Sequence, residues 1–225
     1  MPHSLPPTLA QWQDTTNSGD YFFQVKPTQV GYLVWSHFPI KVYIERTLYA
    51  QRGTSQTQEW VKGVLQAVQE WNVYLPMVVV EHSEVADITI WRSRPALRTS
   101  PGGNLTRARS AETRYELYIS KATDAPYSVL SHRCIIQLSP SQTGGYLQAS
   151  ARHELGHALG IWGHSPVASD ALYFSQVRNP PPISSRDINT LKRVYEQPTR
   201  LGWPIISTRP QHAVLKLGYT VFPSG

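Results

Sequence analysis

The feature that most constrains this chain is the segment 153–164, which contains three histidines and one glutamate. On an α-helix, residues four positions apart lie on one face, so His153 and His157 can direct their imidazoles at a single metal ion. Glu154 is rotated by about 100° from His153 around the helix and can stand beside the ion without binding it. The segment therefore predicts a helix that carries half of a metal site.

The residues after the second histidine predict a turn that completes this site. Gly160 lies three residues past His157, where a chain leaving a helix commonly adopts a left-handed backbone that glycine tolerates. The turn would bring His164 to the same ion as a third ligand. Three histidines and one open position are typical of catalytic rather than structural zinc. Glu154 would then act as the general base that takes a proton from water.

Two other interpretations of the motif have to be considered. A short H-E-x-x-H pattern occurs by chance in many chains, but the added glycine and third histidine favour a metal site. The apolar, helix-forming residues around the motif predict a helix over 146–159. The third ligand could instead be a glutamate on a later helix, and Glu196 is the candidate for that arrangement.

The segment resembles the signature of the metzincin zinc proteases, and within them the matrixin-like branch: H-E-x-x-H-x-x-G-x-x-H followed by a methionine turn. This chain departs from the signature twice. Three residues, not two, separate Gly160 from His164, and Leu172 stands at the position of the turn methionine. We expect Gly163 to absorb the extra residue as a bulge with positive φ, and Leu172 to cushion the ligands as methionine does.

The resemblance implies an α/β fold of the α+β zincin kind. A twisted mixed sheet and two long helices would form an N-terminal lobe, with the active-site helix at the floor of a cleft. A turn and one helix would form a small C-terminal lobe. It also implies a zinc endopeptidase with one catalytic ion and a protein or peptide substrate. A second, structural zinc and calcium are not expected, because only Asp124 and His132 lie near the corresponding loop.

Hydrophobic periodicity places the remaining elements in the order that the resemblance implies. A helix is predicted over 183–195, with Ser184 or Ser185 as its cap before Asp187. Strands are predicted at 38–45, 77–81, 86–91 and 134–138, and a long amphipathic helix at 57–74.

An edge strand is expected to hold the peptide substrate through main-chain hydrogen bonds. This strand would be 107–111 or 115–119.

The expected organisation is a catalytic domain over 35–197 between an N-terminal arm, 1–34, and a C-terminal extension, 198–225. Both flanking segments are rich in Pro, Ser, Thr and Gln. Such arms usually pack on a surface or stay mobile. The alternative is that the N-terminal arm crosses the cleft and that Asp14 or Asp20 lends a carboxylate to the metal.

The net charge of +6 suggests a second kind of function. Six arginines lie between 92 and 114, so the chain could be a non-proteolytic binding protein that retains a zinc site and holds an anionic partner with this loop. Binding of nucleic acid is not expected, because no nucleic-acid fold motif accompanies the arginines. The arginines are Arg92, Arg94, Arg98, Arg107, Arg109 and Arg114.

Three further expectations concern the cysteine, the membrane and the location of the protein. The single cysteine, Cys134, lies in an apolar run and is expected to be buried. No apolar run approaches the ~18 residues of a membrane span, and the chain is expected to be a monomer. Residues 1–10 lack the basic region and apolar core of a signal peptide, so export is favoured by the resemblance alone.

Overall fold

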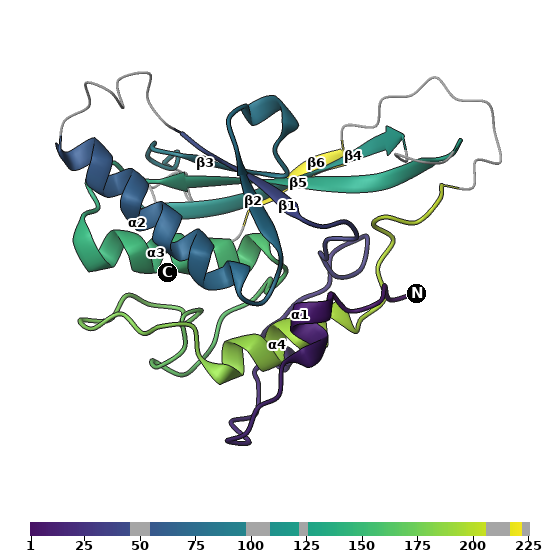
Figure 1. Cartoon of the computed structure of the whole chain (residues 1–225), viewed down its shortest axis with the longest axis horizontal. Coiled ribbons are helices and arrows are strands. Elements are labelled where there is room, and N and C mark those ends of the chain that lie inside the picture. The colour runs from purple at the N-terminus through teal and green to yellow at the C-terminus, as the bar shows by residue number, and fades with distance from the viewer. Residues whose placement is uncertain (46–54, 98–108, 122–125, 206–216, 222–225) are drawn as a thin grey trace, which may run out of the picture.

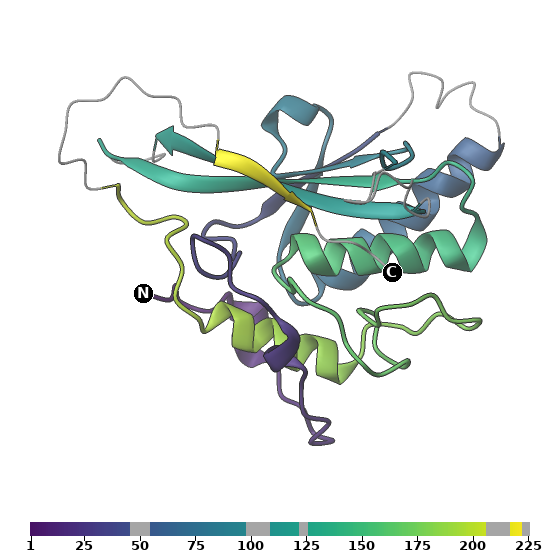
Figure 2. The ribbon, with the colours of Figure 1, turned by 180° about the vertical axis from the view of Figure 1, so that it is seen from behind.

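The computed structural model describes residues 1–45, 55–97, 109–121, 126–205 and 217–221. The fold is mixed α/β, as predicted, and it is built on a twisted mixed sheet (Figure 1). Helices α2 (Ser55–Asn72) and α3 (Gly144–Ala158) lie along one face of the sheet. Helices α1 (Pro7–Gln11) and α4 (Ser185–Tyr195) lie side by side farther from it, as the reverse view also shows (Figure 2).

The sheet has the strand order β2-β1-β3-β5-β4-β6. β1, β2, β3 and β5 run parallel, and β4 is antiparallel to both of its neighbours, β5 and β6. Short 3-10 helices, η1 (Phe22–Gln24) and η2 (Ser83–Val85), lie outside the sheet. The strands are β1 (Ile40–Ile44), β2 (Met77–Val80), β3 (Ile88–Trp91), β4 (Ala111–Lys121), β5 (Ser128–Leu138) and β6 (Leu217–Val221).

The bounds of β1, β2 and β3 fall inside the predicted ranges, whereas β5 begins six residues earlier than predicted. Its first half, from Ser128, pairs with β4 in a long hairpin. The predicted start at Cys134 marks the beginning of the apolar part, because Ser131, His132 and Arg133 interrupt the hydrophobic pattern. One strand, β4, replaces the two alternative edge strands at 107–111 and 115–119. Arg107 and residue 108 lie outside the described residues.

Helices α2 and α3 pack against each other beneath the sheet. The indole of Trp71 on α2 is buried and donates to the carbonyl oxygen of Arg152 on α3 at 2.8 Å. Gly63 allows close approach, because a Cβ there would lie 3.3 Å from the Leu147 side chain. Other buried residues of α2 recur on one face, as an amphipathic helix requires: Trp60, Val64, Ala67 and Val68.

Helix α4 begins where its sequence predicts. Ser184 is the N-cap, and it forms a capping box with Asp187: the Ser184 hydroxyl accepts from the Asp187 amide, and the Asp187 carboxylate accepts from the Ser184 amide. The four apolar residues that predicted the helix are all buried: Ile188, Leu191, Val194 and Tyr195.

The N-terminal arm packs on α4 and does not bring its carboxylates to the histidines. Tyr21 is fully buried, and its amide donates to the Thr190 hydroxyl at 3.0 Å. Asp14 accepts from the Asn189 amide at 2.7 Å, and Asp20 pairs with Arg193 at 2.9 Å. The alternative in which Asp14 or Asp20 reaches the metal is therefore wrong, since both face α4.

The C-terminal extension is also joined to the rest of the fold. Thr199 and Leu201 are buried, and Leu201 forms an isolated bridge with Leu130 of β5. β6 then pairs with the outer edge of β4. Within the described ranges, no helix combines the length and the apolar character needed to cross a membrane.

Candidate metal centre and its cleft

The structure brings the three predicted histidines together. One ring nitrogen from each histidine lies within 4.8 Å of the nitrogens from the other two. His153 and His157 occupy successive turns of α3, and their Nε2 atoms are 3.1 Å apart. Ligands bound tetrahedrally at ~2.0–2.1 Å from one ion would lie about 3.3 Å apart. The cluster is therefore close enough to bind a metal ion.

Hydrogen bonds fix the tautomers of the two helical histidines. His153 Nδ1 lies 2.9 Å from Ala171 O, and His157 Nδ1 lies 2.8 Å from Ile161 O. A carbonyl oxygen only accepts, so each Nδ1 carries a proton, and Nε2 is the nitrogen of each ring that is left to bind a metal. The two Nε2 atoms lie 3.1 Å apart. This donor set fits a divalent metal.

Burial keeps the imidazoles in the form that binds metals. It lowers the pKa of His157 well below its ordinary value, and the neighbouring rings of His153 and His164 lower it further. Burial and the nearby His153 ring also lower the pKa of His164 to about 4. Both rings are therefore neutral at pH 7, and they can ligate a metal without first losing a proton.

The chain turns back at Gly160 and brings His164 close to the other two histidines, as predicted from the glycine. Helix α3 ends at Ala158, and Gly160 has a φ of +130°. A side chain at Gly160 would also meet the carbonyl oxygen of Leu33 at 2.6 Å. The His164 ring lies 4.8 Å from that of His157 and 5.2 Å from that of His153. Both the backbone conformation and the close contact require glycine at position 160.

The longer spacer before His164 is accommodated by burial and not by a special backbone at Gly163. The expected positive φ at Gly163 is wrong, since this glycine is not among those with φ > 0. A Cβ at Gly163 would lie 2.3 Å from the backbone oxygen of Gln24 in the N-terminal arm. The amide of Lys26 also donates to Trp162 O at 3.1 Å. Gly163 is needed because the arm passes directly over it.

Substitution of Gly163 by valine should destabilise the protein by about 3 kcal/mol, the upper end for overpacking, because the Gln24 backbone cannot rotate away as a side chain could. Urea unfolding of the zinc-free protein measures the loss. The matched control is Gly145→Ala, since nothing lies within 4 Å of a Cβ at Gly145. A Gly163→Val protein as stable as the control would contradict the contact.

The turn after His164 packs against α3 and contacts His153. Leu172 is fully buried and packs on Gly156, which lies between the two helical histidines; a Cβ at Gly156 would come within 2.6 Å of Leu172 Cδ2. Asp187 accepts from the amide of Ala171 at 2.9 Å, and Ala171 O in turn accepts from His153. The turn that contains Leu172 thus orients His153, and the buried carboxylate of Asp187 holds the turn.

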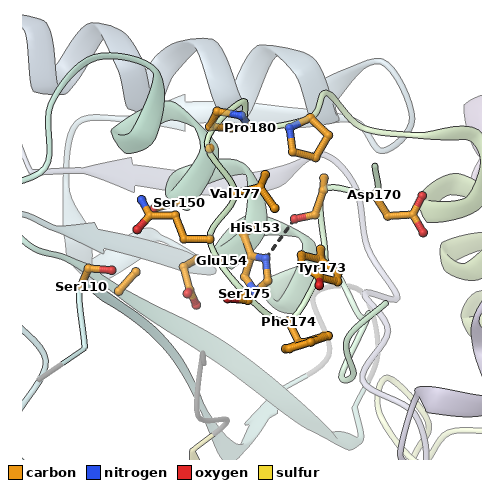
Figure 3. Close-up of a pocket in the computed structure, with 15 residues that line it drawn as sticks. Ser110, Ser150, His153, Glu154, Asp170, Tyr173, Phe174, Ser175, Val177 and Pro180 are labelled. Carbon is orange, nitrogen blue, oxygen red and sulfur yellow. Dashed lines mark hydrogen bonds between the residues drawn. The ribbon is translucent and has the colours of Figure 1, made fainter. Parts of the chain in front are cut away.

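Glu154 and His153 both line an open pocket (Figure 3). Its Oε2 accepts a hydrogen bond from the Thr113 hydroxyl of β4 at 2.6 Å. The pocket is bounded by the first residues of β4, by α3 and by the segment after the turn. Its lining includes Ser110, Ala111, Ala149, Ser150, His153, Tyr173, Phe174, Val177, Pro180 and Pro181.

Two supporting residues have little local signal in the sequence, because their roles depend on contacts with distant residues. Thr113 touches Glu154 across 41 positions, and nothing near it in sequence marks it as part of the site. Arg152, directly before His153, is buried and pairs with Glu70 of α2 at 2.6 Å. A charged residue at position 152, next to the apolar Ala151 and Leu155 of the predicted helix, is the one signal in the sequence that points to Arg152.

Other candidate residues lie away from the cluster. Glu196 is exposed at the C-cap of α4 and does not belong to the group of three histidines. His132 is buried against Trp35 at a ring distance of 3.9 Å, and burial lowers its pKa to about 3. Asp124 lies outside the described residues. Cys134 is buried as expected, and burial raises the pKa of its thiol.

The edge of β4 that was expected to hold substrate is partly covered by the chain itself. β6 pairs antiparallel with β4, from Leu217 opposite Leu117 to Val221 opposite Arg114. This pairing ends one residue short of Thr113. The part of β4 that lines the pocket, at Ala111, lies beyond the described end of β6.

Two of the described arginines of the basic loop, Arg109 and Arg114, have partners within the protein. Arg109 pairs with Glu112 at 3.2 Å, and Arg114 Nη2 donates to Gln137 at 2.8 Å. Arg98 and Arg107 lie outside the described residues.

Comparison with known proteins finds neither a family model that matches this chain nor a curated relative with significant sequence similarity.

Proposed function

We propose that the protein is a zinc-dependent endopeptidase with a metzincin-like, matrixin-like active site. The observation that carries the proposal is the convergence of three histidine nitrogens within 4.8 Å, with Glu154 lining the same open pocket as His153. Three histidines with an adjoining carboxylate make up the catalytic zinc site of this class of hydrolase.

In this proposal, His153, His157 and His164 hold the zinc. A zinc ion bound there would lower the pKa of a water molecule towards ~7 and polarise the peptide carbonyl. Glu154 takes the proton from the attacking water and later gives it to the leaving amine. The Thr113 hydroxyl, 2.6 Å from Glu154 Oε2, keeps the carboxylate turned towards the pocket.

The peptide would lie along the start of β4, with one side chain in the pocket next to His153. That pocket is lined mainly by small and apolar residues. The only carboxylates among the lining residues are those of Glu154 and Asp170, and Asp170 is buried and engaged by Arg186 at 3.0 Å. An uncharged substrate side chain is therefore favoured. A peptide that used the edge farther along, at Arg114–Leu117, would have to displace β6.

The rival arrangement, with a glutamate as third ligand, is tested by zinc content. We expect His164→Ala to lose zinc on dialysis and Glu196→Ala to keep about one zinc per chain, because only His164 lies in the cluster. Plasma mass spectrometry of the two purified proteins gives both values. Zinc retained by His164→Ala and lost by Glu196→Ala would overturn the ligand set.

The alternative of a non-proteolytic binding protein has less support. Its working surface would be the Arg-rich loop, yet Arg109 and Arg114 already contact Glu112 and Gln137. A purely structural zinc site also has no need of a carboxylate beside the ion, where Glu154 stands. The test is incubation of the zinc-loaded chain with a mixed peptide library. Cleavage that a chelator abolishes and zinc restores would support the peptidase, and no cleavage would favour the binding protein.

A further inference from the structure

An ion pair between a buried arginine and a partly exposed glutamate joins α3 to α2 directly beside the histidine cluster. Arg152, the residue before His153, is 7% exposed. Its Nε and Nη2 donate to the Glu70 carboxylate at 2.6 and 3.2 Å, so that the guanidinium binds both carboxylate oxygens. The Gln148 amide also donates to Glu70 at 2.7 Å. Glu70 is therefore held in place from α3 and fixes the plane of the guanidinium.

The remaining nitrogen of the same guanidinium contacts residues 174–183, the segment that forms one wall of the pocket. Arg152 Nη1 donates to the carbonyl oxygen of Pro181 at 2.6 Å, and Pro181 lines the pocket beside Glu154. Arginine suits this task because its rigid fork can bind a carboxylate and a carbonyl at once, whereas lysine is a single point charge.

The wall itself has few other attachments. Residues 174–183 form no helix or strand. In the part of the chain that the structure describes, two hydrogen bonds tie this segment to α3: the Arg152–Pro181 bond and a bond from the Tyr146 hydroxyl to Arg178 O at 3.1 Å. Tyr146 is 42% exposed, so its bond competes with water. Residues 180–182 are prolines and have no N–H to donate.

We propose that Arg152, oriented by Glu70, is a positioning residue that sets the wall of the pocket and thereby the side chain that the pocket accepts. The effect on substrate choice rests on the proposed peptidase function. The anchoring of the wall by Arg152 depends only on the hydrogen bonds described above. Arg152 lies in a buried, low-dielectric position, where a hydrogen bond from a charged group is worth more than the exposed bond of Tyr146.

The test compares Arg152→Lys with the unmodified full chain. Lysine keeps the charge opposite Glu70 but cannot reach the carboxylate and Pro181 O together. We expect kcat/KM for the preferred peptide to fall about tenfold through KM, with kcat within about threefold, because the wall contributes binding that is equal in ground and transition states. The preference between peptides that differ only in the pocket side chain should shrink by a similar factor, while zinc content stays at one per chain.

A second measurement does not depend on activity. Trypsin cleavage of the zinc-free chain after Arg178, followed by mass spectrometry, reports detachment of the wall. We expect this bond to be cut about tenfold faster in Arg152→Lys, from the loss of one charged hydrogen bond. Tyr146→Phe should give a smaller increase. The matched control is Arg133→Lys, which alters an ion pair to Glu116 on the β4–β5 hairpin and should change neither readout.

Unchanged cleavage after Arg178 together with unchanged peptide preference would overturn the proposal and leave the ion pair as a helix-packing contact. If Arg152→Lys fails to fold, Glu70→Gln gives the same comparison, because it removes the charge that orients the guanidinium. Absence of peptide cleavage by the unmodified chain would contradict the proposed peptidase, and the trypsin measurement would still decide whether Arg152 holds the wall.

Discussion

Replacement of Glu154 by glutamine should leave about one zinc per chain and lower the rate of peptide cleavage ~10²–10⁴-fold, the range typical for loss of a general base. The amide keeps the size of the side chain and can still accept from the Thr113 hydroxyl, so the pocket should be preserved. It cannot take a proton from water. Steady-state cleavage of a fluorogenic peptide, with zinc measured on the same samples, checks the expectation.

The control variant is Thr113→Val, which leaves the Glu154 carboxylate in place but removes the hydroxyl that orients it. We expect a smaller loss of activity, with zinc content unchanged. If Glu154→Gln loses its zinc, Glu154 belongs to the metal-binding set and not to proton transfer. Full activity in Glu154→Gln would exclude it as the base.

The second large effect is expected from Trp162→Ala, which should lower the free energy of unfolding by about 3–5 kcal/mol, as for other buried aromatic residues. Trp162 is 3% exposed, and its ring meets Tyr115 of β4 edge-on at 5.2 Å. It also lies edge-on to His157 at 6.0 Å. Urea unfolding of the zinc-free protein measures the loss, and zinc titration should show weaker binding because the spacer positions His164.

A matched control for this change is Phe23→Ala in the N-terminal arm, since Phe23 is 74% exposed. It should alter stability by no more than about 0.5 kcal/mol, as surface substitutions usually do. A loss below about 1 kcal/mol in Trp162→Ala would mean that the longer spacer is not part of the core, and that its length is tolerated for another reason.

The elements that the sequence predicted well are those with local signals. Helix α4 has a capping box at Ser184 and Asp187 and an apolar stripe, and both signals lie within the helix itself. The two histidines of α3 and the glycine after them depend on helical periodicity and on one backbone conformation at Gly160. Such features need no knowledge of the rest of the fold, so the three histidines could be assigned to one cluster from sequence.

The features that the sequence did not predict depend on contacts between distant residues. In the first half of β5, Ser131, His132 and Arg133 interrupt the apolar pattern, and the strand there follows from pairing with β4, along Ser128–Lys121 to Leu138–Ala111. Gly163 was expected to need a positive φ, but the constraint is the backbone of Gln24 in the arm. No local sequence pattern indicates that the Gln24 backbone lies against Gly163. Likewise, none indicates that the Arg152 guanidinium contacts Pro181.

The proposed zinc site is tested most directly by a crystal structure of the full chain loaded with zinc, with the ion identified by its anomalous scattering. We expect one zinc per chain, bound by the Nε2 atoms of His153 and His157 and by a ring nitrogen of His164 at ~2.0–2.1 Å. Its remaining position should face Glu154 and the pocket. A zinc ion held by any other set of residues, or none between these histidines after loading with excess zinc, would contradict the account.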